Sequence, residues 1–279
     1  MNHLKEGKAS RPDGFTFNFV HKFRDLIKVD VWHVVEESMT LHWLLPSLNA
    51  TFIALIHKEE HSITPDKFRP IALYNFIYKV ISKVIASHLK LLFPLLISPE
   101  QLGYVEGWQI IDDIILTHEI IHSLKHNKKI GMLLKINLFK AFDKLSWIYI
   151  QKMLTAFGFF PPWVRWVMNL VSSTFFSILV NGIHSSPFHP SRGIHQGDPI
   201  SPFLFVLMVE GLGCIIKNTL QTQQLRGILV HDSPTITHQQ FVDDNMLFGH
   251  PSFQEALMFK SMLDDYLEAS GASINTAKS

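Results

Sequence analysis

The dipeptide Asn181-Gly182 separates two runs that are rich in β-branched and aromatic residues, 174–180 and 183–188. Asn-Gly between such runs is the strongest short-range signal for a β-hairpin, because both residues accept the positive φ angles of a tight turn. A second hairpin is predicted over 241–248, where apolar residues flank a short acidic turn. The chain is therefore expected to contain antiparallel β-sheet.

Apolar residues recur with helical or strand periodicity along most of the chain. Helices are predicted over 17–39, 76–93, 147–157, 161–171, 199–220 and 252–271, and further strands over 49–57, 131–137, 226–231 and 235–241. The first part of the chain is mainly helical, and the remainder combines helices with an antiparallel sheet. This order of elements predicts the α+β fold class.

The composition excludes several classes of protein. A chain of 279 residues that is 47% apolar and 18% charged can build a packed core, which excludes disorder, collagen and coiled coils. The net charge of +1 argues neither for nor against a nucleic-acid partner. The charge is unevenly spread, because residues 1–180 are basic overall whereas residues 181–279 carry 5 basic and 9 acidic side chains.

The single Cys214 cannot form an internal disulfide, which indicates an intracellular protein. The first ten residues are polar and charged and lack the apolar core of a signal peptide. The longest apolar run, 202–216, is interrupted by Glu210 and by glycines, so no membrane span is expected. We expect a soluble intracellular protein without a membrane partner, and the sequence does not distinguish nucleus from cytoplasm.

Asp243 and Asp244 lie together in the second predicted hairpin. An isolated pair of this kind is most often a solvated turn, in which aspartate hydrogen-bonds its own backbone. The alternative is a site for hard cations, since Mg²⁺ prefers carboxylate oxygens and a pair of such ions can assist phosphoryl transfer. That chemistry requires carboxylates from a second segment of the chain.

Residues 191–202 connect the first hairpin to a buried helix and have the sequence SRGIHQGDPISP. Two glycines allow close approach of the backbone, and Arg192 and Gln196 supply hydrogen-bond donors. Pro199 and Pro202 suit the first turn of a helix. The segment could lie against a nucleotide and its template base, or it could be a tight junction between loop and helix, and its composition leaves both interpretations open.

Taken together, the motifs resemble those of the reverse transcriptases of plant non-LTR (LINE-type) retrotransposons. RGIHQGDPISPFLF is followed about forty residues later by FVDD, and the other matching segments occur in the expected order. These are RPDGFTFNFVHKF, NATFIALIHKEE, FRPIALYNFIYKVISKVIASHL, ISPEQLGYVEGWQIIDDI, KINLFKAFDKLSW, GFFPPWVRWVMNLVSSTFFSILVNG and ASGASINTAKS. The resemblance covers almost the whole chain.

This resemblance implies a right-hand polymerase with fingers over residues 1–130 and a palm over residues 131–279 that contains the antiparallel sheet. Because the chain ends directly after the last palm motif, a thumb is expected to be absent. The family extends a DNA primer on an RNA template with dNTPs and two Mg²⁺ ions. The oligomeric state remains open.

The resemblance assigns metal-binding and catalytic roles to three positions and places a fourth near the primer end. Asp243 and Asp244 match the palm carboxylates that hold metal, and Val242 takes the variable position before them, near the primer end. Lys278 matches a late-palm lysine that protonates the leaving pyrophosphate. These roles follow from the family motif alone.

Five further positions are expected to bind the nucleotide. Gln196 and Gly197 would contact the incoming nucleotide and the template, and Phe142 matches the bulky residue that selects dNTPs by blocking a ribose 2′-OH. Arg69 and Lys79 fall where fingers residues meet the triphosphate. For Lys79 a solvated helix face is an equally good interpretation, since Lys83 and Lys90 share its helix.

Asn137 departs from the family motif, which has its remaining metal-bridging aspartate five residues before Phe142. Asparagine offers one neutral carbonyl oxygen and two donor hydrogens where aspartate offers two anionic oxygens. Asp143 is an unsuitable substitute because it already belongs to the motif. Arg11 and Trp108 also replace the usual Gly and Arg.

Three functional hypotheses follow from this pattern. The first is a reverse transcriptase domain, by descent an RNA-directed DNA polymerase, whose activity is weak or lost because of Asn137. The second is a non-catalytic RNA-binding remnant that uses the basic face of the predicted fingers. The third is a retrotransposon fragment without retained function.

Overall fold

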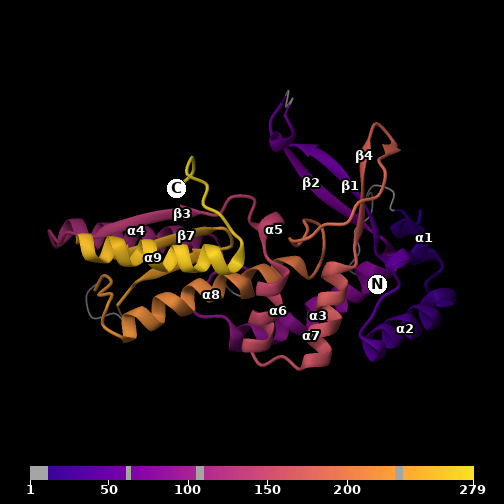
Figure 1. Cartoon of the computed structure of the whole chain (residues 1–279), viewed down its shortest axis with the longest axis horizontal. Helices are drawn as coiled ribbons and strands as arrows, with labels where there is room; N and C mark the ends of the chain where they lie inside the picture. The colour runs from indigo at the N-terminus through magenta and orange to yellow at the C-terminus, as the bar shows by residue number, and fades with distance from the viewer. Residues whose placement is uncertain (1–11, 61–63, 105–109, 230–234) are drawn as a thin grey trace. The chain divides into compact units, whose positions relative to one another are not determined.

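The computed structural model describes residues 12–60, 64–104, 110–229 and 235–279 (Figure 1). The chain divides into two compact units, each built from two stretches of sequence. Unit 1 comprises residues up to 88 together with 154–201, and unit 2 comprises residues 89–153 and 202–279. The boundary between fingers and palm expected at residue 130 separates functions, whereas these units are defined by packing. That boundary stays a prediction.

Unit 1 contains a four-stranded sheet in the order β2-β1-β4-β5. Its strands are β1 (Ala50–His57), β2 (Phe68–Tyr74), β4 (Phe175–Val180) and β5 (Ile183–His184). β1 pairs antiparallel with β2 and parallel with β4, as the neighbouring ribbons in Figure 1 illustrate. The predicted Asn-Gly hairpin is confirmed as β4–β5, although its second strand has only two residues before the chain returns to bridge Phe188 to Phe176.

The first predicted helix is interrupted at Phe23, which ends α1 (Phe17–Lys22) and precedes α2 (Arg24–Leu41). Val20 and Val31 from these helices pack with Phe76 at the start of α3 (Phe76–Leu96). The Pro161-Pro162 start is confirmed by α7 (Pro161–Ser172). Short 3₁₀ turns occupy Pro46–Asn49 and Pro65–Lys67.

Unit 2 contains a three-stranded antiparallel sheet in the order β3-β7-β6. Its strands are β3 (Met132–Asn137), β6 (His238–Phe241) and β7 (Asp244–Gly249). The predicted acidic hairpin is confirmed, but its turn consists of Val242 and Asp243, because Asp244 is already the first residue of β7. The strand predicted over 235–241 is shorter than expected, because β6 begins at His238. Of the strand predicted over 226–231, residues 230 and 231 lie outside the described residues, and Ile228 forms an isolated bridge with Ile236.

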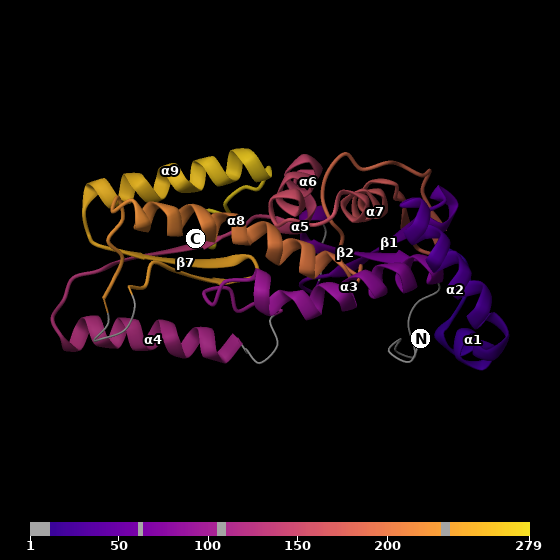
Figure 2. The same ribbon diagram turned by 90° about the horizontal axis from the view of Figure 1, so that it is seen from below.

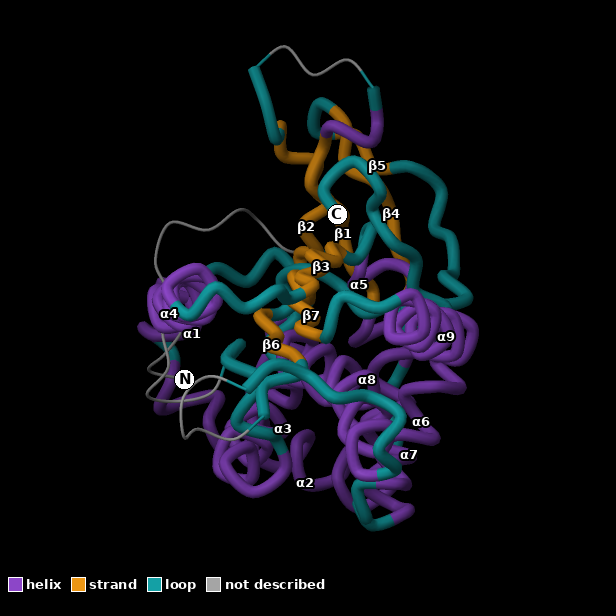
Figure 3. Tube along the Cα trace, turned by 90° about the vertical axis from the view of Figure 1, so that its left-hand side faces the viewer, coloured by secondary structure: helices purple, strands orange, loops and turns teal. Residues whose placement is uncertain are grey.

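Helices cover both faces of this sheet. They are α4 (Ile110–His126), α8 (Ser201–Gln221) and α9 (Phe253–Ser270), while the shorter helices α5 (Ala141–Lys144) and α6 (Trp147–Ala156) follow β3 in the sequence. Figures 2 and 3 show α4 on one face of the β3-β7-β6 sheet and α8 and α9 on the other. Ile120 of α4 packs on Phe248 of β7, and Phe259 of α9 approaches Gly249.

Helix α8 is long and apolar enough to cross a membrane by length and composition. However, 61% of its most apolar window is buried inside the protein, which is typical of a core helix. Glu210, which interrupts the apolar run, is itself only 4% exposed. Burial raises the pKa of this carboxyl above its ordinary value.

The predicted capping box at the start of α9 forms only in part. The Ser252 hydroxyl accepts from the Glu255 N–H at 3.2 Å, but the Glu255 carboxylate accepts from the His250 N–H at 2.8 Å and not from that of Ser252. The helix ends at Gly271, whose φ of 74° is left-handed. Glu255 therefore ties the end of β7 to α9.

Ser252→Ala is expected to destabilise the protein by about 1 kcal/mol, because it removes the N-cap hydrogen bond of α9. Urea denaturation measures the change. Ser261→Ala, at an exposed position in the middle of the same helix, is the matched control and should be neutral or slightly stabilising. Equal losses in both variants would contradict a capping role for Ser252.

Candidate active site

The pairing of β3 with β7 brings Asn137 directly opposite Asp244. Asp244 also pairs with Phe241 across the hairpin, so Asp243 lies in the turn beside the last residue of β3. The Leu138 N–H donates to the Asp243 carbonyl at 2.9 Å and fixes this arrangement. The backbone of unit 2 thus gathers the three residues expected to form the metal site.

The Asn137 side-chain amide lies between the two carboxylates. Its Nδ2 atom is 3.3 Å from Oδ2 of Asp243 and 3.0 Å from Oδ1 of Asp244, and the residue is only 6% exposed. An amide nitrogen has two hydrogens to donate, one for each carboxylate. Lys135 Nζ also lies 3.7 Å from Asp244 Oδ1, but both side chains are about half exposed, so this ion pair contributes at most about 1 kcal/mol.

The turn that carries Asp243 has an unusual backbone. Val242 has a φ of 56°, which is rare and costly for a β-branched residue. A Cβ on Gly103 would lie 2.9 Å from Val242 Cγ2 and 3.1 Å from its backbone nitrogen, so only glycine allows this close approach. The Leu102 N–H donates to the Gln240 carbonyl, and the Gln240 N–H donates to the Glu100 carbonyl. These hydrogen bonds attach residues 100–102 to β6, the strand that leads into the turn. Gly103 is present in the sequence as part of QLGY, but the motif itself does not show that this glycine packs against Val242.

The last residues of the chain bind the end of β3. The Asn137 N–H donates to the Ser279 hydroxyl at 3.0 Å, and the Asn137 carbonyl accepts from the Asn275 N–H at 2.8 Å. Lys278 belongs to this turn and its N–H donates to the Asn275 carbonyl at 3.0 Å. Lys278 therefore lies in a turn that binds the backbone of Asn137, while its role as a proton donor stays a prediction.

Phe142 lies on α5, directly after β3. Its ring stacks on Phe205 of α8, with ring centroids 4.7 Å apart and an angle of 14° between the planes. This contact holds the ring in place on the core helix of unit 2. The expected selection against a ribose 2′-OH is consistent with a fixed ring but stays a prediction.

Gln196 and Gly197 contact β2 in unit 1, the strand that also carries Arg69. The Ala72 N–H of β2 donates to the Gln196 carbonyl at 2.8 Å, and Arg69 is exposed three residues earlier on the same strand. Gly197 has a φ of 104°, and a Cβ there would lie 2.7 Å from the Ala72 carbonyl oxygen. Lys79 lies in the first turn of α3, where its N–H donates to the Asn75 carbonyl at 3.1 Å.

Asp198 follows Gly197 and was not identified by the sequence reasoning. Its side chain is 4% exposed and accepts hydrogen bonds from the hydroxyls of Tyr78 and Ser82 on α3. These partners lie 120 and 116 residues away in the sequence, so no local motif could reveal them.

The donor set does not fit two divalent cations. Asp243 and Asp244 supply carboxylate oxygens, but Asn137 directs amide hydrogens at both of them, where a third anionic ligand is required. Asp143 is exposed on α5, and no group of three His, Cys, Asp or Glu side chains able to hold a metal occurs in the described part of the chain. Asp143 therefore does not complete the set.

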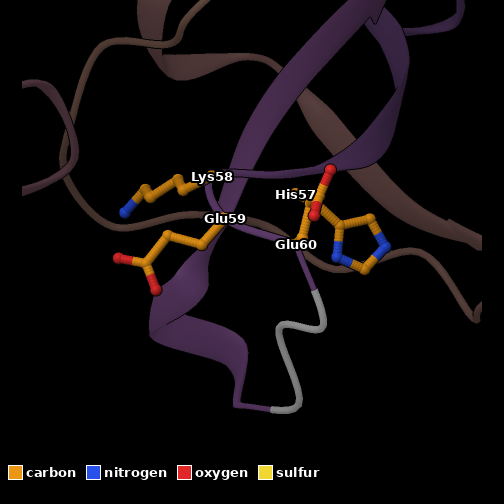
Figure 4. Close-up of a pocket in the computed structure, with 4 residues that line it drawn as sticks. All are labelled: His57, Lys58, Glu59 and Glu60. Carbon is orange, nitrogen blue, oxygen red and sulfur yellow. The ribbon is translucent and has the colours of Figure 1, made fainter.

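Figure 4 shows a pocket of about 710 Å³ at the end of β1, lined by His57, Lys58, Glu59 and Glu60. Glu59 forms an exposed ion pair with Lys67 at 3.2 Å. None of the expected nucleotide-binding residues lines this pocket. The two other departures from the family motif, Arg11 and Trp108, lie outside the described residues.

The fold and the acidic hairpin define a class, the polymerases with fingers and a palm. The structure is similar to telomerase from Candida tropicalis in complex with a fragment of telomeric RNA, with a TM-score of 0.57 and 14% identity over 85% of this chain and 41% of that one. A second structure from this organism, of apo telomerase truncated from its C-terminal domain, gives a TM-score of 0.54 at 15% identity and covers 89% of this chain and 54% of that one. These likenesses establish the α+β polymerase fold.

The family model described as "Reverse transcriptase (RNA-dependent DNA polymerase)" matches residues 56–279, so the chain belongs to this family. It is 25% identical over 277 residues to the 149 kDa protein of transposon TX1 from Xenopus laevis, a match that covers 99% of this chain and 21% of that protein. It is 28% identical over 215 residues to the Pol polyprotein of the R2DM element from Drosophila melanogaster, covering 77% of this chain and 19% of that one. The chain is a reverse transcriptase domain of the non-LTR type and spans about a fifth of the length of these relatives.

Proposed function

We propose that this domain descends from an RNA-directed DNA polymerase that extends a DNA primer on an RNA template with dNTPs, and that its polymerisation is impaired. The observation that supports impairment is the Asn137 amide, which donates to both Asp243 and Asp244. In the family motif this position is an anionic metal ligand. Here it supplies donor hydrogens, which repel a cation and satisfy the carboxylates without one.

Magnesium ions, when bound in this family, supply charge stabilisation for nucleotidyl transfer. In this chain Asp243 and Asp244 remain available as ligands. Asn137 could offer its Oδ1 atom only by turning the amide and giving up both hydrogen bonds, each worth about 1.5–3 kcal/mol to a charged acceptor. The residues present therefore favour the metal-free arrangement of the carboxylate pair.

Primer extension on an RNA template tests this proposal. The full 279-residue chain is incubated with Mg²⁺ and dNTPs and compared with its Asn137→Asp variant. Little synthesis by the unaltered chain and clear synthesis by the variant would support both parts of the proposal. Robust synthesis by the unaltered chain would contradict impairment, and two inactive proteins would contradict the assignment of the defect to Asn137.

A second candidate function is RNA binding without catalysis, and it is supported by the surface of α3. Lys79 and Lys83 lie one turn apart on this helix, and Lys83 is exposed. The opposite side of the helix is buried through Tyr78, Ile81 and Ile85. Lys83 is therefore exposed where a phosphate could contact it, and Lys79 lies one turn earlier on the same helix.

RNA binding through this face is expected to weaken steeply as salt rises, because cations on the RNA are released when lysines replace them. Replacing Lys79 and Lys83 by alanine should weaken binding and reduce the slope of log K against log salt by about 1 for each lysine lost. Fluorescence anisotropy with single-stranded RNA measures both. Lys260→Ala on α9 is the control, and an equal effect there, or binding that does not depend on salt, would contradict this candidate.

A chain that neither extends primers nor binds RNA would match the third hypothesis of no retained function.

A further inference from the structure

The Asp198 carboxyl is held by four hydrogen-bond donors inside unit 1. Tyr78 donates its hydroxyl at 2.8 Å and Ser82 donates a second hydroxyl, both from α3. The Ile200 N–H at 3.3 Å and the Ser201 hydroxyl at 3.4 Å complete the set from the start of α8. The loop that ends at Asp198 is thereby fastened to a helix more than a hundred residues earlier in the chain.

The chemistry of this cluster suits an ionised carboxylate, which accepts hydrogen bonds and cannot donate them. All four partners are able to donate. Burial raises the pKa of Asp198, and the hydrogen bonds from Ser82 and Tyr78 oppose that rise. Tyr74 stacks on the ring of Tyr78 with centroids 4.2 Å apart, so the Tyr78 hydroxyl is held in a fixed direction.

The residues just before Asp198 are fastened to β2. The Gln196 carbonyl accepts from the Ala72 N–H, and Gly197 packs so closely on the Ala72 carbonyl that a side chain would not fit. Asp198 holds the other end of the same short segment. Because one attachment limits the freedom of the other, losing the Asp198 contacts should let the segment lift from β2.

We propose that Asp198 is a positioning residue, which uses Tyr78 and Ser82 to set the Gln196-Gly197 backbone on β2 at Ala72 and thereby tightens the binding of the incoming dNTP. The proposal rests on the assignment of this loop to the nucleotide under the proposed function. Asp198 is not placed in contact with substrate. It acts through the residues that precede it.

Hydrogen exchange tests the positioning step in the chain as it stands. Tyr78→Phe and Ser82→Ala each remove one donor to Asp198, and we expect exchange of the Ala72 N–H to accelerate about tenfold or more. Tyr149→Phe is the matched control, since its partly buried hydroxyl donates to the Met208 carbonyl at 3.1 Å in unit 2. Unchanged exchange at Ala72, or an equal acceleration throughout unit 1, would overturn the proposal.

A kinetic experiment tests the consequence for the nucleotide. In the Asn137→Asp background, Tyr78→Phe should raise the KM for dNTP about five- to tenfold while kcat changes less than twofold, because the loss concerns binding and not the chemical step. A lower kcat with an unchanged KM would overturn the proposal. If the Asn137→Asp protein synthesises no DNA, the assignment of the defect to Asn137 fails, and the exchange experiment still decides whether Asp198 positions the loop.

Discussion

Asn137→Asp is expected to raise the rate of primer extension on the order of a hundredfold or more. The substitution exchanges an amide that donates to Asp243 and Asp244 for a carboxylate that can share a cation with them. Metal stabilisation of a phosphoryl-transfer transition state is worth several kcal/mol, and about 1.4 kcal/mol corresponds to tenfold in rate. Single-nucleotide incorporation under saturating dNTP measures the gain.

The matched control is Asn181→Asp, which makes the same chemical change in the β4–β5 turn of unit 1 and should leave extension unchanged. Asp243→Asn in the Asn137→Asp background should remove the gain again. If Asn181→Asp raised the rate of extension equally, the increase would come from added charge or solubility and not from the carboxylate site.

Thermal unfolding gives a second readout for the same variant. Without divalent cations three carboxylates repel one another and two hydrogen bonds are lost, so the variant should unfold at a lower temperature than the parent. Mg²⁺ should then stabilise the variant by about 2.7 kcal/mol at a free concentration 100 times its Kd. A parent chain that gains as much from Mg²⁺ as the variant would show that Asn137 does not obstruct the site.

Phe248→Ala is expected to cost about 3–5 kcal/mol of the free energy of unfolding. Phe248 is fully buried on β7, where it packs with Ile120 of α4 and with Ile228. Its removal leaves a cavity between the sheet and α4, four residues beyond Asp244. Guanidinium denaturation, followed by circular dichroism, measures the loss.

The control for this prediction is Phe253→Ala, because Phe253 is 80% exposed at the start of α9. Loss of an exposed ring changes stability by about 0.5 kcal/mol at most. Similar losses in the two variants would mean that α4 does not pack on β7 as described.

Most of the fold was predictable from the strong periodicity of apolar residues. The helix α4 and the strand β2 were not predicted from this periodicity. The helix α4 was not predicted, because its apolar residues do not mark one buried face: Ile111, Ile114 and Ile115 are each at least 50% exposed. Strand β2 was missed because Pro70 cannot donate to a sheet. β2 is an edge strand, where a proline is tolerated, and Pro70 pairs there with Leu55.

The candidate site was predictable in its residues but not in its contacts. The motif identified Asp243, Asp244 and the departure at Asn137 from the sequence alone. That the Asn137 amide donates to both carboxylates depends on the register of β3 against β7, which no local pattern specifies. The Asp198 cluster was missed for a related reason, since its donors come from a helix far away in the sequence.

The bond between the Asn137 N–H and Ser279 joins residues 142 positions apart. A ribosome that adds 5–20 residues per second needs on the order of ten seconds to cover that separation. Until Asn275 and Ser279 have been synthesised, the end of β3 lacks the hydrogen-bond partners that they provide. Asp243 and Asp244 are also synthesised about a hundred residues after β3. The carboxylate pair is thus assembled during translation only after the sheet of unit 1 has all of its strands.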